Sequence, residues 1–170
     1  MGTRGGGTGL PPFEAFVERH RRTVYRFLLV AVGPGEADDV FQETFLAALR
    51  AYPRLRDAER LDRWILRIAT RKAIDAHRSR RRRPLPAEDA MERADRAAEP
   101  IGSWDGDDPL WRAVRSLPPR QRAAVVHRLV LDRPYGQIAE ALGSSEQAVR
   151  ANVSQGVRRL RALLSEGVGR

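Results

Sequence analysis

Residues 135–160 read YGQIAEALGSSEQAVRANVSQGVRRL, and the rest of the chain is best understood from this segment. Apolar residues recur in it with helical spacing as far as Leu142, and Gly143 can take the left-handed conformation that ends a helix. Either Ser144 or Ser145 can then cap a following helix with its hydroxyl. The stretch therefore predicts two helices that meet at a tight turn.

The second of these helices has an apolar side and a polar side. Val149 and Val153 lie one turn apart and are expected to point inward. The outward positions are Gln147, Arg150, Ala151, Asn152, Ser154 and Gln155. Arginine suits guanine edges and Asn or Gln suits adenine, while Arg158 and Arg159 can contact phosphates. This pattern predicts a helix-turn-helix with its second helix in the DNA major groove, and an ordinary helical hairpin is the alternative.

Composition favours a polyanionic partner. The chain has 170 residues, of which 42% are hydrophobic, so it can form one ordinary domain or two small ones. Its net charge is +9, and its basic residues are 30 Arg and one Lys, Lys72. Arginine is well suited to phosphate and guanine, although GC-rich codons are another explanation for the bias.

Several classes of protein are disfavoured. The chain has no cysteine, no apolar run of membrane-spanning length and no apolar signal core near its start, so we expect a cytoplasmic protein without membrane insertion. His20, His77 and His127 lack the spacing of a metal site, and no glycine-rich phosphate loop follows a strand pattern. We therefore expect no catalytic residues, no metal and no cofactor.

Charge divides the chain into three parts. Residues 1–83 carry 18 basic and 10 acidic side chains, residues 84–108 carry 2 and 8, and residues 109–170 carry 11 and 4. The middle part is poor in large apolar residues and predicts a flexible linker, with a short helix over 87–98 as the alternative. The expected fold is all-α, with two small helical domains joined by this acidic linker. The expected segments are a disordered tail 1–12, a domain 13–83, the linker 84–108, a domain 109–165 and a tail 166–170.

Three helices are predicted in the first domain. One begins at Phe13 and is ended by Gly33, Pro34 and Gly35; a second covers 36–52; and a third begins near Leu61. The third is expected to direct Leu61, Trp64, Ile65, Ile68, Ala69 and Ile74 to the core. The second exposes Asp39, Gln42 and Glu43, which helix-terminal electrostatics alone could explain. Its apolar side is expected to hold Val40, Phe41, Phe45, Ala48 and Leu49.

The third helix also carries a basic stripe. Arg63, Arg67 and Arg71 recur at every fourth position, joined by Lys72 and Arg78, and like charges at this spacing repel unless an anion neutralises them. The run RSRRRR over 78–83 extends the stripe, and Arg54 and Arg56 lie in the preceding charged loop. The pattern favours a nucleic-acid surface over a merely solvated face.

The second domain begins before the helix-turn-helix. Leu110, Trp111, Val114 and Leu117 fit one helix, which Pro118 and Pro119 interrupt. Four further residues are expected to continue the core: Val125, Val126, Leu129 and Val130.

These residues resemble a known family. The segments DDVFQETFLAALRAY (38–52) and LDRWILRIATRKAIDAHRSRRRR (61–83) resemble region 2 of a bacterial RNA polymerase sigma factor of the extracytoplasmic-function group, group 4 of the sigma-70 family. LPPRQRAAVV (117–126) and the helix-turn-helix resemble region 4. In this family, region 2 binds the clamp helices of the polymerase and opens the minus-10 element. Region 4 binds the minus-35 element and the polymerase flap.

The resemblance assigns residues to three surfaces. The polymerase-binding residues it implies are Asp38, Asp39, Gln42, Glu43 and Phe45. The implied minus-10 residues are Arg54, Arg56, Arg63, Trp64, Arg67, Arg71, Lys72 and Arg78. The implied minus-35 residues are Gln147, Arg150, Asn152, Ser154, Gln155, Arg158 and Arg159. The loop 53–62 takes the place where these proteins capture a flipped base. Members commonly have Asn where this chain has Arg71, and Arg where it has Asn152 and Gln155.

The function implied is that of a sigma factor, which binds core RNA polymerase and directs it to a promoter. Its partners are then the polymerase and promoter DNA, both duplex and single-stranded, with an anti-sigma factor as a further candidate. One alternative is a stand-alone helix-turn-helix repressor or activator, which would usually need a dimer. Another is an enzyme with an appended DNA-binding module, for which the sequence offers no catalytic constellation.

Overall fold

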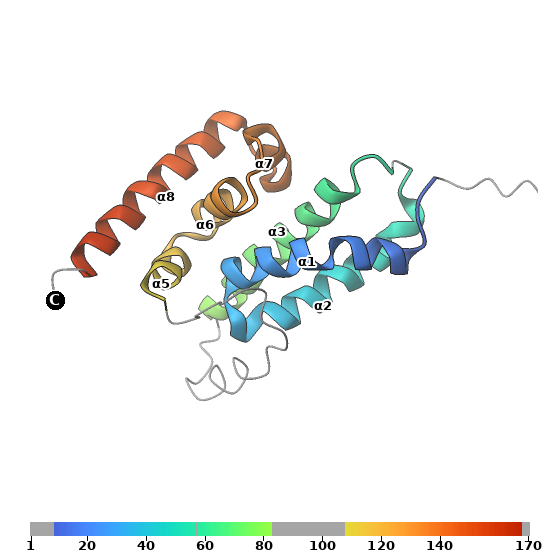
Figure 1. The fold of residues 1–170 in the computed structure, drawn as a ribbon, viewed down its shortest axis with the longest axis horizontal. Helices are drawn as coiled ribbons and strands as arrows, with labels where there is room; N and C mark the ends of the chain where they lie inside the picture. Colours follow the sequence, from blue (N-terminus) through green and yellow to red (C-terminus); the bar gives the residue numbers. More distant parts are fainter. Residues whose placement is uncertain (1–8, 57, 83–107, 168–170) are drawn as a thin grey trace, which may run out of the picture.

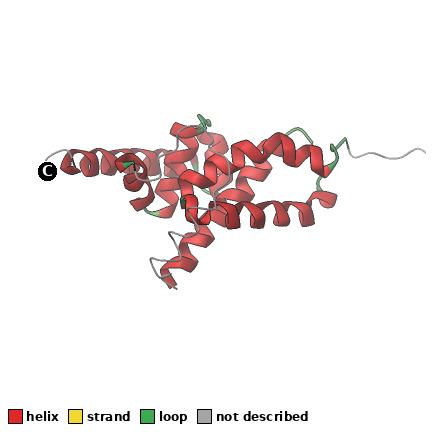
Figure 2. Cartoon of the chain, turned by 60° about the horizontal axis from the view of Figure 1, so that its bottom comes forward, coloured by secondary structure: helices red, strands yellow, loops and turns green. Residues whose placement is uncertain are grey.

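The structure, a computed structural model, describes residues 9–56, 58–82 and 108–167. Within these ranges the chain forms helices joined by short turns, and no strand is present (Figures 1 and 2). The prediction of an all-α fold is confirmed. The tail residues 1–8 and 168–170, Asp57, Arg83 and residues 84–107 of the predicted acidic linker lie outside the described residues.

The first module is made of three packed helices and a 3-10 turn. They are α1 (Phe13–Val32), α2 (Pro34–Ala51), η1 (Tyr52–Arg54) and α3 (Leu61–Arg82). Gly33 is the single residue between α1 and α2, and its φ of 90° is a conformation that favours glycine. Pro34 occupies the first turn of α2, where its missing N–H has no cost, so α2 begins two residues earlier than predicted.

An aromatic cluster holds the first module together. The Phe16 ring lies 5.1 Å from Tyr52 and 5.7 Å from Trp64, measured between ring centroids. The Tyr52 hydroxyl donates a hydrogen bond of 2.7 Å to the carbonyl oxygen of Pro11. The segment before α1 is thereby fixed to the end of α2.

The second module contains five helical elements. They are α5 (Pro109–Ser116), α6 (Pro119–Val125), the π-helix η2 (Val126–Val130), α7 (Tyr135–Leu142) and α8 (Glu146–Gly167). The carboxylate of Asp108 accepts a hydrogen bond from the Leu110 N–H and caps α5. The predicted interruption at the two prolines is found: Pro118 lies between α5 and α6, and Pro119 begins α6.

The predicted inward position of Leu129 is wrong, because 62% of this residue is exposed. In a π-helix each N–H bonds to the carbonyl five residues earlier, not four as in an α-helix. The side chains of this turn are therefore shifted from the positions they would have in an α-helix. Val130 packs against the core as predicted, and Leu131 contacts it in place of Leu129.

The two modules pack directly against each other. In Figure 1, α5, α6 and α7 lie between α8 and the first module, and α3 contacts both α6 and α7. Ile74 accordingly packs against the apolar cluster of the second module, which corrects its predicted place in the first core. The major apolar cluster also crosses the boundary, since it joins residues of α1–α3 to Val114, Val125 and Leu160.

Candidate DNA and protein interfaces

The helix-turn-helix has the local geometry that its sequence predicts. Gly143 ends α7 with φ 58° and ψ 47°, in the left-handed region. The Ser145 hydroxyl then accepts a hydrogen bond of 3.2 Å from the Ala148 N–H and caps α8. Val149 and Val153 are buried and join an apolar cluster with Ile138. Packing inside the hairpin therefore fixes how α8 presents its outer face.

The outer face of α8 is open to solvent. Its exposed members from the predicted set are Gln147, Arg150, Ser154, Gln155, Arg158 and Arg159. Asn152 is half-buried at the edge of this face. The Gln155 side-chain oxygen already accepts a hydrogen bond of 2.9 Å from the Gln121 amide of α6. Within this outer face, Gln147, Arg150 and Ser154 are therefore more accessible to DNA than Gln155 is.

A basic and aromatic cluster borders this face, and the sequence prediction missed two of its members. The guanidinium carbon of Arg150 lies 4.2 Å from the centroid of the Tyr135 ring, and that of Arg128 lies 5.4 Å from it. Arg128 forms an ion pair of 2.8 Å with the exposed Asp132. The three side chains line one open cleft. Arg128 and Tyr135 belong to different helices, so no periodic pattern in the sequence joins them to Arg150.

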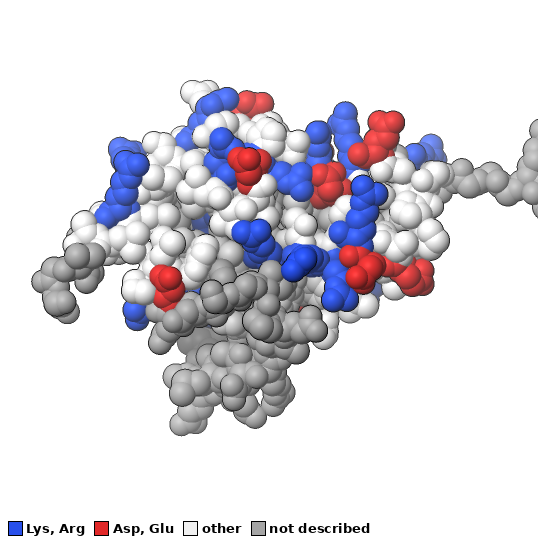
Figure 3. All heavy atoms as spheres, in the orientation of Figure 1, with Lys and Arg blue, Asp and Glu red and all other residues white. Residues whose placement is uncertain are grey.

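The residues of the basic stripe on α3 differ in exposure, and one of them forms an ion pair. Arg71 and Arg78 are exposed, while Arg63 and Arg67 are half-buried. The Lys72 Nζ lies 3.3 Å from the Glu43 Oε2 on α2, in a partly exposed ion pair. On the face drawn in Figure 3, basic side chains spread over both modules with acidic ones among them.

The remaining residues of the minus-10 set lie at one end of the first module. Arg54 and Arg56 are exposed in the segment between α2 and α3. The Trp64 ring is half-buried, because it packs against Phe16 and Tyr52. It is a member of the aromatic cluster as well as a residue at the surface.

The outward side of α2 combines polar and apolar groups. Asp39, Gln42 and Glu43 are exposed, as the sequence predicted. Leu46 and Leu49 are also exposed, by 53% and 48%, and they continue this side of the helix toward its end. The prediction that Leu49 lies on the inward, apolar side is therefore wrong. An apolar side chain at this spacing beside carboxylates is the signal that could have identified Leu46.

Two of the residues implied for polymerase binding are engaged within the module. Phe45 is only 8% exposed and packs 4.8 Å from the Phe41 ring, so it supports the surface from within. Asp38 is half-buried and accepts a hydrogen bond from the Tyr25 hydroxyl. Burial, followed by the bond to Asp38, raises the pKa of Tyr25 to about 12. The exposed part of the predicted set is therefore Asp39, Gln42 and Glu43.

The histidines do not meet. His20 lies against Phe16 in the first module, whereas His127 is buried between the modules, where burial and then the charge of Arg133 lower its pKa to about 4. Over the part of the chain that the structure describes, no group of three His, Cys, Asp or Glu side chains could hold a metal. No helix in that same part is long and apolar enough to cross a membrane.

Comparisons with known proteins agree with this arrangement. The family profile described as Sigma-70 region 2 matches residues 16–83, and the one described as Sigma-70, region 4 matches residues 107–160. The RNA polymerase sigma factor CarQ of Myxococcus xanthus is 33% identical over 160 residues, which cover 91% of this chain and 90% of CarQ.

Two further likenesses concern a longer relative and the fold. The ECF RNA polymerase sigma factor SigG of Mycobacterium tuberculosis is 32% identical over 166 residues, which cover 82% of this chain but only 45% of SigG. The sigma factor RpoE of Bartonella quintana, solved in complex with the anti-sigma factor NepR, has a TM-score of 0.70 and 21% identity, covering 93% of this chain and 98% of RpoE. With both regions matched in order, the chain belongs to the sigma-70 family, as a sigma factor of its extracytoplasmic-function group.

Proposed function

We propose that this chain binds core RNA polymerase and directs it to a promoter, where region 4 reads duplex DNA and region 2 stabilises separated strands. The observation that carries the proposal is the presence, on one chain, of an exposed reading face on α8 and an exposed acidic and apolar face on α2. The polymerase, and not this chain, would then carry out the catalytic reaction. The protein would work where its polymerase works, in the cytoplasm.

The α2 face suits a protein partner. Leu46 and Leu49 offer apolar area to bury, while Asp39, Gln42 and Glu43 fix orientation through charge and hydrogen bonds. Clamp helices that present basic side chains and a small apolar patch would complement it. The buried Phe45 and the Tyr25 bond to Asp38 hold the helix in place beneath this face.

The α8 face suits the minus-35 duplex. Gln147, Arg150 and Ser154 project from the helix and carry groups that match base edges in the major groove. Arg128 and Tyr135 flank Arg150 at the start of the motif and suit a phosphate of the same site. The ion pairs of Arg128 with Asp132 and of Arg150 with Glu146 are exposed, so a phosphate can exchange for either carboxylate at little cost.

The α3 stripe suits the opened minus-10 strand. Separating base pairs costs about 1.4 kcal/mol per step in stacking, and a protein without a fuel source must recover this by binding the separated strands. Arg67, Arg71 and Arg78 lie on a rigid helix and can follow a single-strand backbone. The loop 53–62 beside them is the place for an unstacked base.

One alternative function and one additional partner are also considered. A stand-alone repressor or activator would use the same α8 face, but it gives no role to the exposed leucines and carboxylates of α2. An anti-sigma factor is proposed as an additional partner, because the RpoE structure of similar fold contains one.

Transcription with reconstituted polymerase tests the proposed function. Core enzyme with this chain should produce a discrete transcript from a promoter selected from random sequence, and core enzyme alone should not. Replacing the minus-35 element should weaken recruitment, and replacing the minus-10 element should block opening. If the chain binds the selected DNA as well without core enzyme and yields no transcript with it, the repressor or activator is the better account.

A further inference from the structure

The ring of Tyr135 lies where the two helices of the helix-turn-helix meet. Tyr135 is the first residue of α7 and follows Pro134, whose extended backbone sets where the helix begins. The half-buried ring packs against the apolar cluster that contains Ile138, Val149 and Val153. Because the core of the motif holds the ring, it forms a fixed surface beside the start of α8.

Arg150 of α8 places its guanidinium over this ring. The guanidinium carbon lies 4.2 Å from the ring centroid, well inside the distance of about 6 Å at which an aromatic face attracts a cation. Side chains of an α-helix lean toward its N-terminus, and the Arg150 Nη2 accordingly lies 3.6 Å from the Oε2 of Glu146, one turn earlier. In a helix-turn-helix, the first residues of the second helix reach the base edges. The guanidinium is therefore held at the end of α8 that enters the groove.

The contact with the ring leaves the hydrogen-bonding edge of Arg150 available. The side chain is 60% exposed, although its guanidinium lies over Tyr135. The distance of 3.6 Å to Glu146 is longer than a hydrogen bond, so this ion pair does not use up the donor. Arg150 can therefore donate two parallel hydrogen bonds to the O6 and N7 atoms of a guanine.

Gly136 makes room for a second restraint on the same arginine. A Cβ at this position would lie 2.9 Å from the Oε1 of Glu146. The Glu146 carboxylate therefore lies directly against the backbone of α7, next to the residue that carries the ring. Two successive residues at the start of α7 thus fix the surroundings of Arg150: Tyr135 contacts its guanidinium, and Gly136 accommodates the carboxylate that pairs with it.

Holding an arginine before DNA arrives changes how well it discriminates between bases. A free arginine side chain loses much rotamer freedom when it binds, and a side chain that is already oriented loses less. A bidentate contact to guanine also requires the plane of the guanidinium to match the plane of the base. A fixed orientation therefore favours guanine over bases that a mobile arginine would reach with a single bond.

Arg128 provides a comparison on the same ring. Its guanidinium carbon lies 5.4 Å from the Tyr135 centroid, but it belongs to η2 and not to the recognition helix. It also forms the 2.8 Å ion pair with Asp132. An arginine outside the recognition helix suits a phosphate, which carries no sequence information. The two arginines beside Tyr135 are thus expected to have different effects on binding.

We propose that Tyr135 is a positioning residue for base reading: its ring, together with Glu146, holds Arg150 in the orientation that recognises a guanine of the minus-35 element. The inference rests on the proposed function and deepens it, because it names the base and the residue that sets the specificity. Tyr135 acts through Arg150 and needs no contact with the base.

Binding of the holoenzyme, which is core polymerase with this chain, to promoter duplexes that vary at minus-35 tests this role. Arg150→Ala identifies the base pair concerned, as the position at which the preference for guanine is lost. At that base pair, Tyr135→Leu should reduce the preference by about twofold to fivefold, the factor expected for an exposed cation–π contact. Tyr135→Phe keeps the ring and should retain the wild-type preference.

Arg128→Ala is the matched control, because it removes the other arginine from the same ring. It should weaken binding evenly across sequences and lower the salt slope by about one, with the guanine preference unchanged. Loss of the guanine preference in Arg128→Ala as well would show that the ring does not act specifically on Arg150, and would overturn the proposal.

Gly136→Ala separates positioning from damage to the fold. Alanine favours a helix over glycine, and the atom that its methyl group would meet is the end of a flexible side chain, so thermal stability should not fall. The methyl group displaces the Glu146 carboxylate, so the guanine preference should decrease, by less than in Tyr135→Leu. An unchanged preference would overturn the part assigned to Glu146.

A double-mutant cycle distinguishes positioning from direct contact. In the Arg150→Ala background, Tyr135→Leu should change the guanine preference no further, because the ring acts through Arg150. An equal loss from Tyr135→Leu in both backgrounds would mean that Tyr135 contacts the DNA itself, and would overturn the proposal. An unchanged preference in Tyr135→Leu alone, or in Arg150→Ala, would overturn it as well. If the wild-type holoenzyme shows no preference at minus-35, the proposed function fails instead.

Discussion

His127 Nε2 and Thr70 Oγ1 lie 2.8 Å apart, and this bond joins the second module to the middle of α3 in a site closed to water. Burial, with the charge of Arg133 as the smaller cause, lowers the pKa of His127 from 6.5 to about 4. The imidazole is therefore neutral in the folded chain at neutral pH. The buried pair ties the stability of the fold to pH.

Stability should fall as pH falls from about 6.5 toward 4. Across this window the unfolded chain binds a proton at His127 and the folded chain does not, so the free energy of unfolding rises with pH. The full effect is at most about 4 kcal/mol, because the pKa falls from 6.5 to about 4 and each pKa unit is worth roughly 1.4 kcal/mol. Urea unfolding at several pH values measures it. His127→Asn should be less stable at pH 7 and should lose this part of the slope. An unchanged slope would mean that the fold does not lower the pKa of His127.

Gly156→Ala should destabilise the second module. A Cβ at this position would lie 2.6 Å from the Val125 Cγ2 and 3.7 Å from the Leu117 Cδ1, where α8 crosses α6. Overpacking of this kind typically costs about 1–3 kcal/mol, which exceeds the gain in helix propensity of about 1 kcal/mol. Thermal unfolding measures the change, with Ser154→Ala on the exposed side of α8 as the control. A more stable Gly156→Ala variant would show that α6 and α8 can move apart without a loss of stability.

Asp39→Arg with Gln42→Ala should abolish binding to core polymerase while helical content is kept. Charge reversal at a desolvated contact should cost several kcal/mol, whereas the same change on a solvated face stays within about half a kcal/mol. Leu46→Ala should weaken binding as well, because that side chain is 53% exposed and contributes little to the fold. Co-purification with core enzyme measures both, and Glu18→Arg on α1 is the control. Normal binding by the double variant would remove α2 from the interface.

Substitutions on α8 should divide into two kinds. Gln147→Ala and Arg150→Ala should change which bases are preferred at minus-35, by about 1–3 kcal/mol for a good bidentate contact. Arg158→Ala and Arg159→Ala should weaken binding evenly across sequences and lower the salt slope by about one per lost phosphate contact. Binding to a library of duplexes at several salt concentrations separates the two. Uniform loss in all four variants would mean that the reading face is placed wrongly.

Asn152 and Gln155 should contribute less to base preference than Gln147 and Arg150. Asn152 is half-buried, and Gln155 is already bonded to Gln121, so a base must compete with an existing partner. The same duplex library measures this ranking. A larger change in preference for Gln155→Ala than for Gln147→Ala would show that the Gln121 bond is released on DNA.

Local patterns in the sequence were sufficient for the helices and for the exposed faces. The left-handed Gly143, the Ser145 cap and the inward Val149 follow from short-range rules, and each is found in the structure. Contacts between the modules follow no such rule. Ile74 satisfies a helical pattern equally well on either side of α3, and only the packing of α6 and α7 decides which side it faces.

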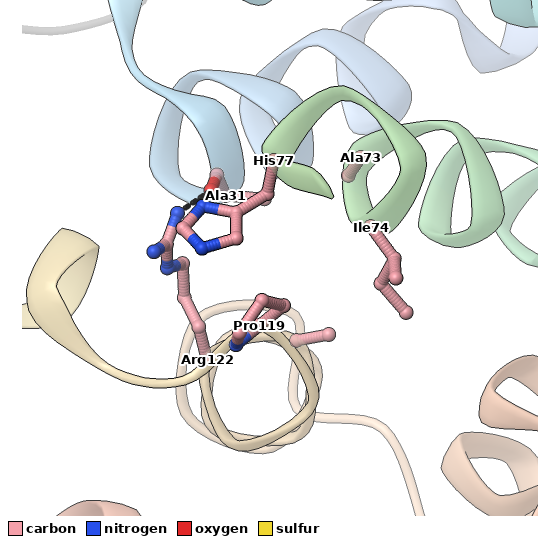
Figure 4. A pocket seen from close by; sticks show the side chains of 7 residues that line it. Ala31, Ala73, Ile74, His77, Pro119 and Arg122 are labelled. Carbon is pink, nitrogen blue, oxygen red and sulfur yellow. Dashed lines mark hydrogen bonds between the residues drawn. The ribbon is translucent and has the colours of Figure 1, made fainter. Parts of the chain in front are cut away.

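Two other residues show the same limit. Leu129 has the spacing of a core residue, but the π-helical turn that exposes it depends on tertiary packing of α6 and η2. In the sequence, the buried Arg122 cannot be told apart from the other arginines of a basic chain. Its role depends on the carbonyl groups of Ala31 (Figure 4) and Leu117, which are 91 and 5 residues away in sequence. Charge counts predict a polyanionic partner, but they do not distinguish a surface arginine from an interior one.

Transcription from a duplex promoter and from a template that is already open tests whether the α3 stripe melts promoter DNA. Arg67→Ala with Arg71→Ala should leave association with polymerase intact and reduce transcription from a duplex promoter. On a template that already carries a mismatched minus-10 bubble, the double variant should recover much of the wild-type activity, because the melting cost of about 1.4 kcal/mol per step is absent. Equal defects on the duplex and the bubble template would show that the stripe serves initial docking, and the melting account would be contradicted.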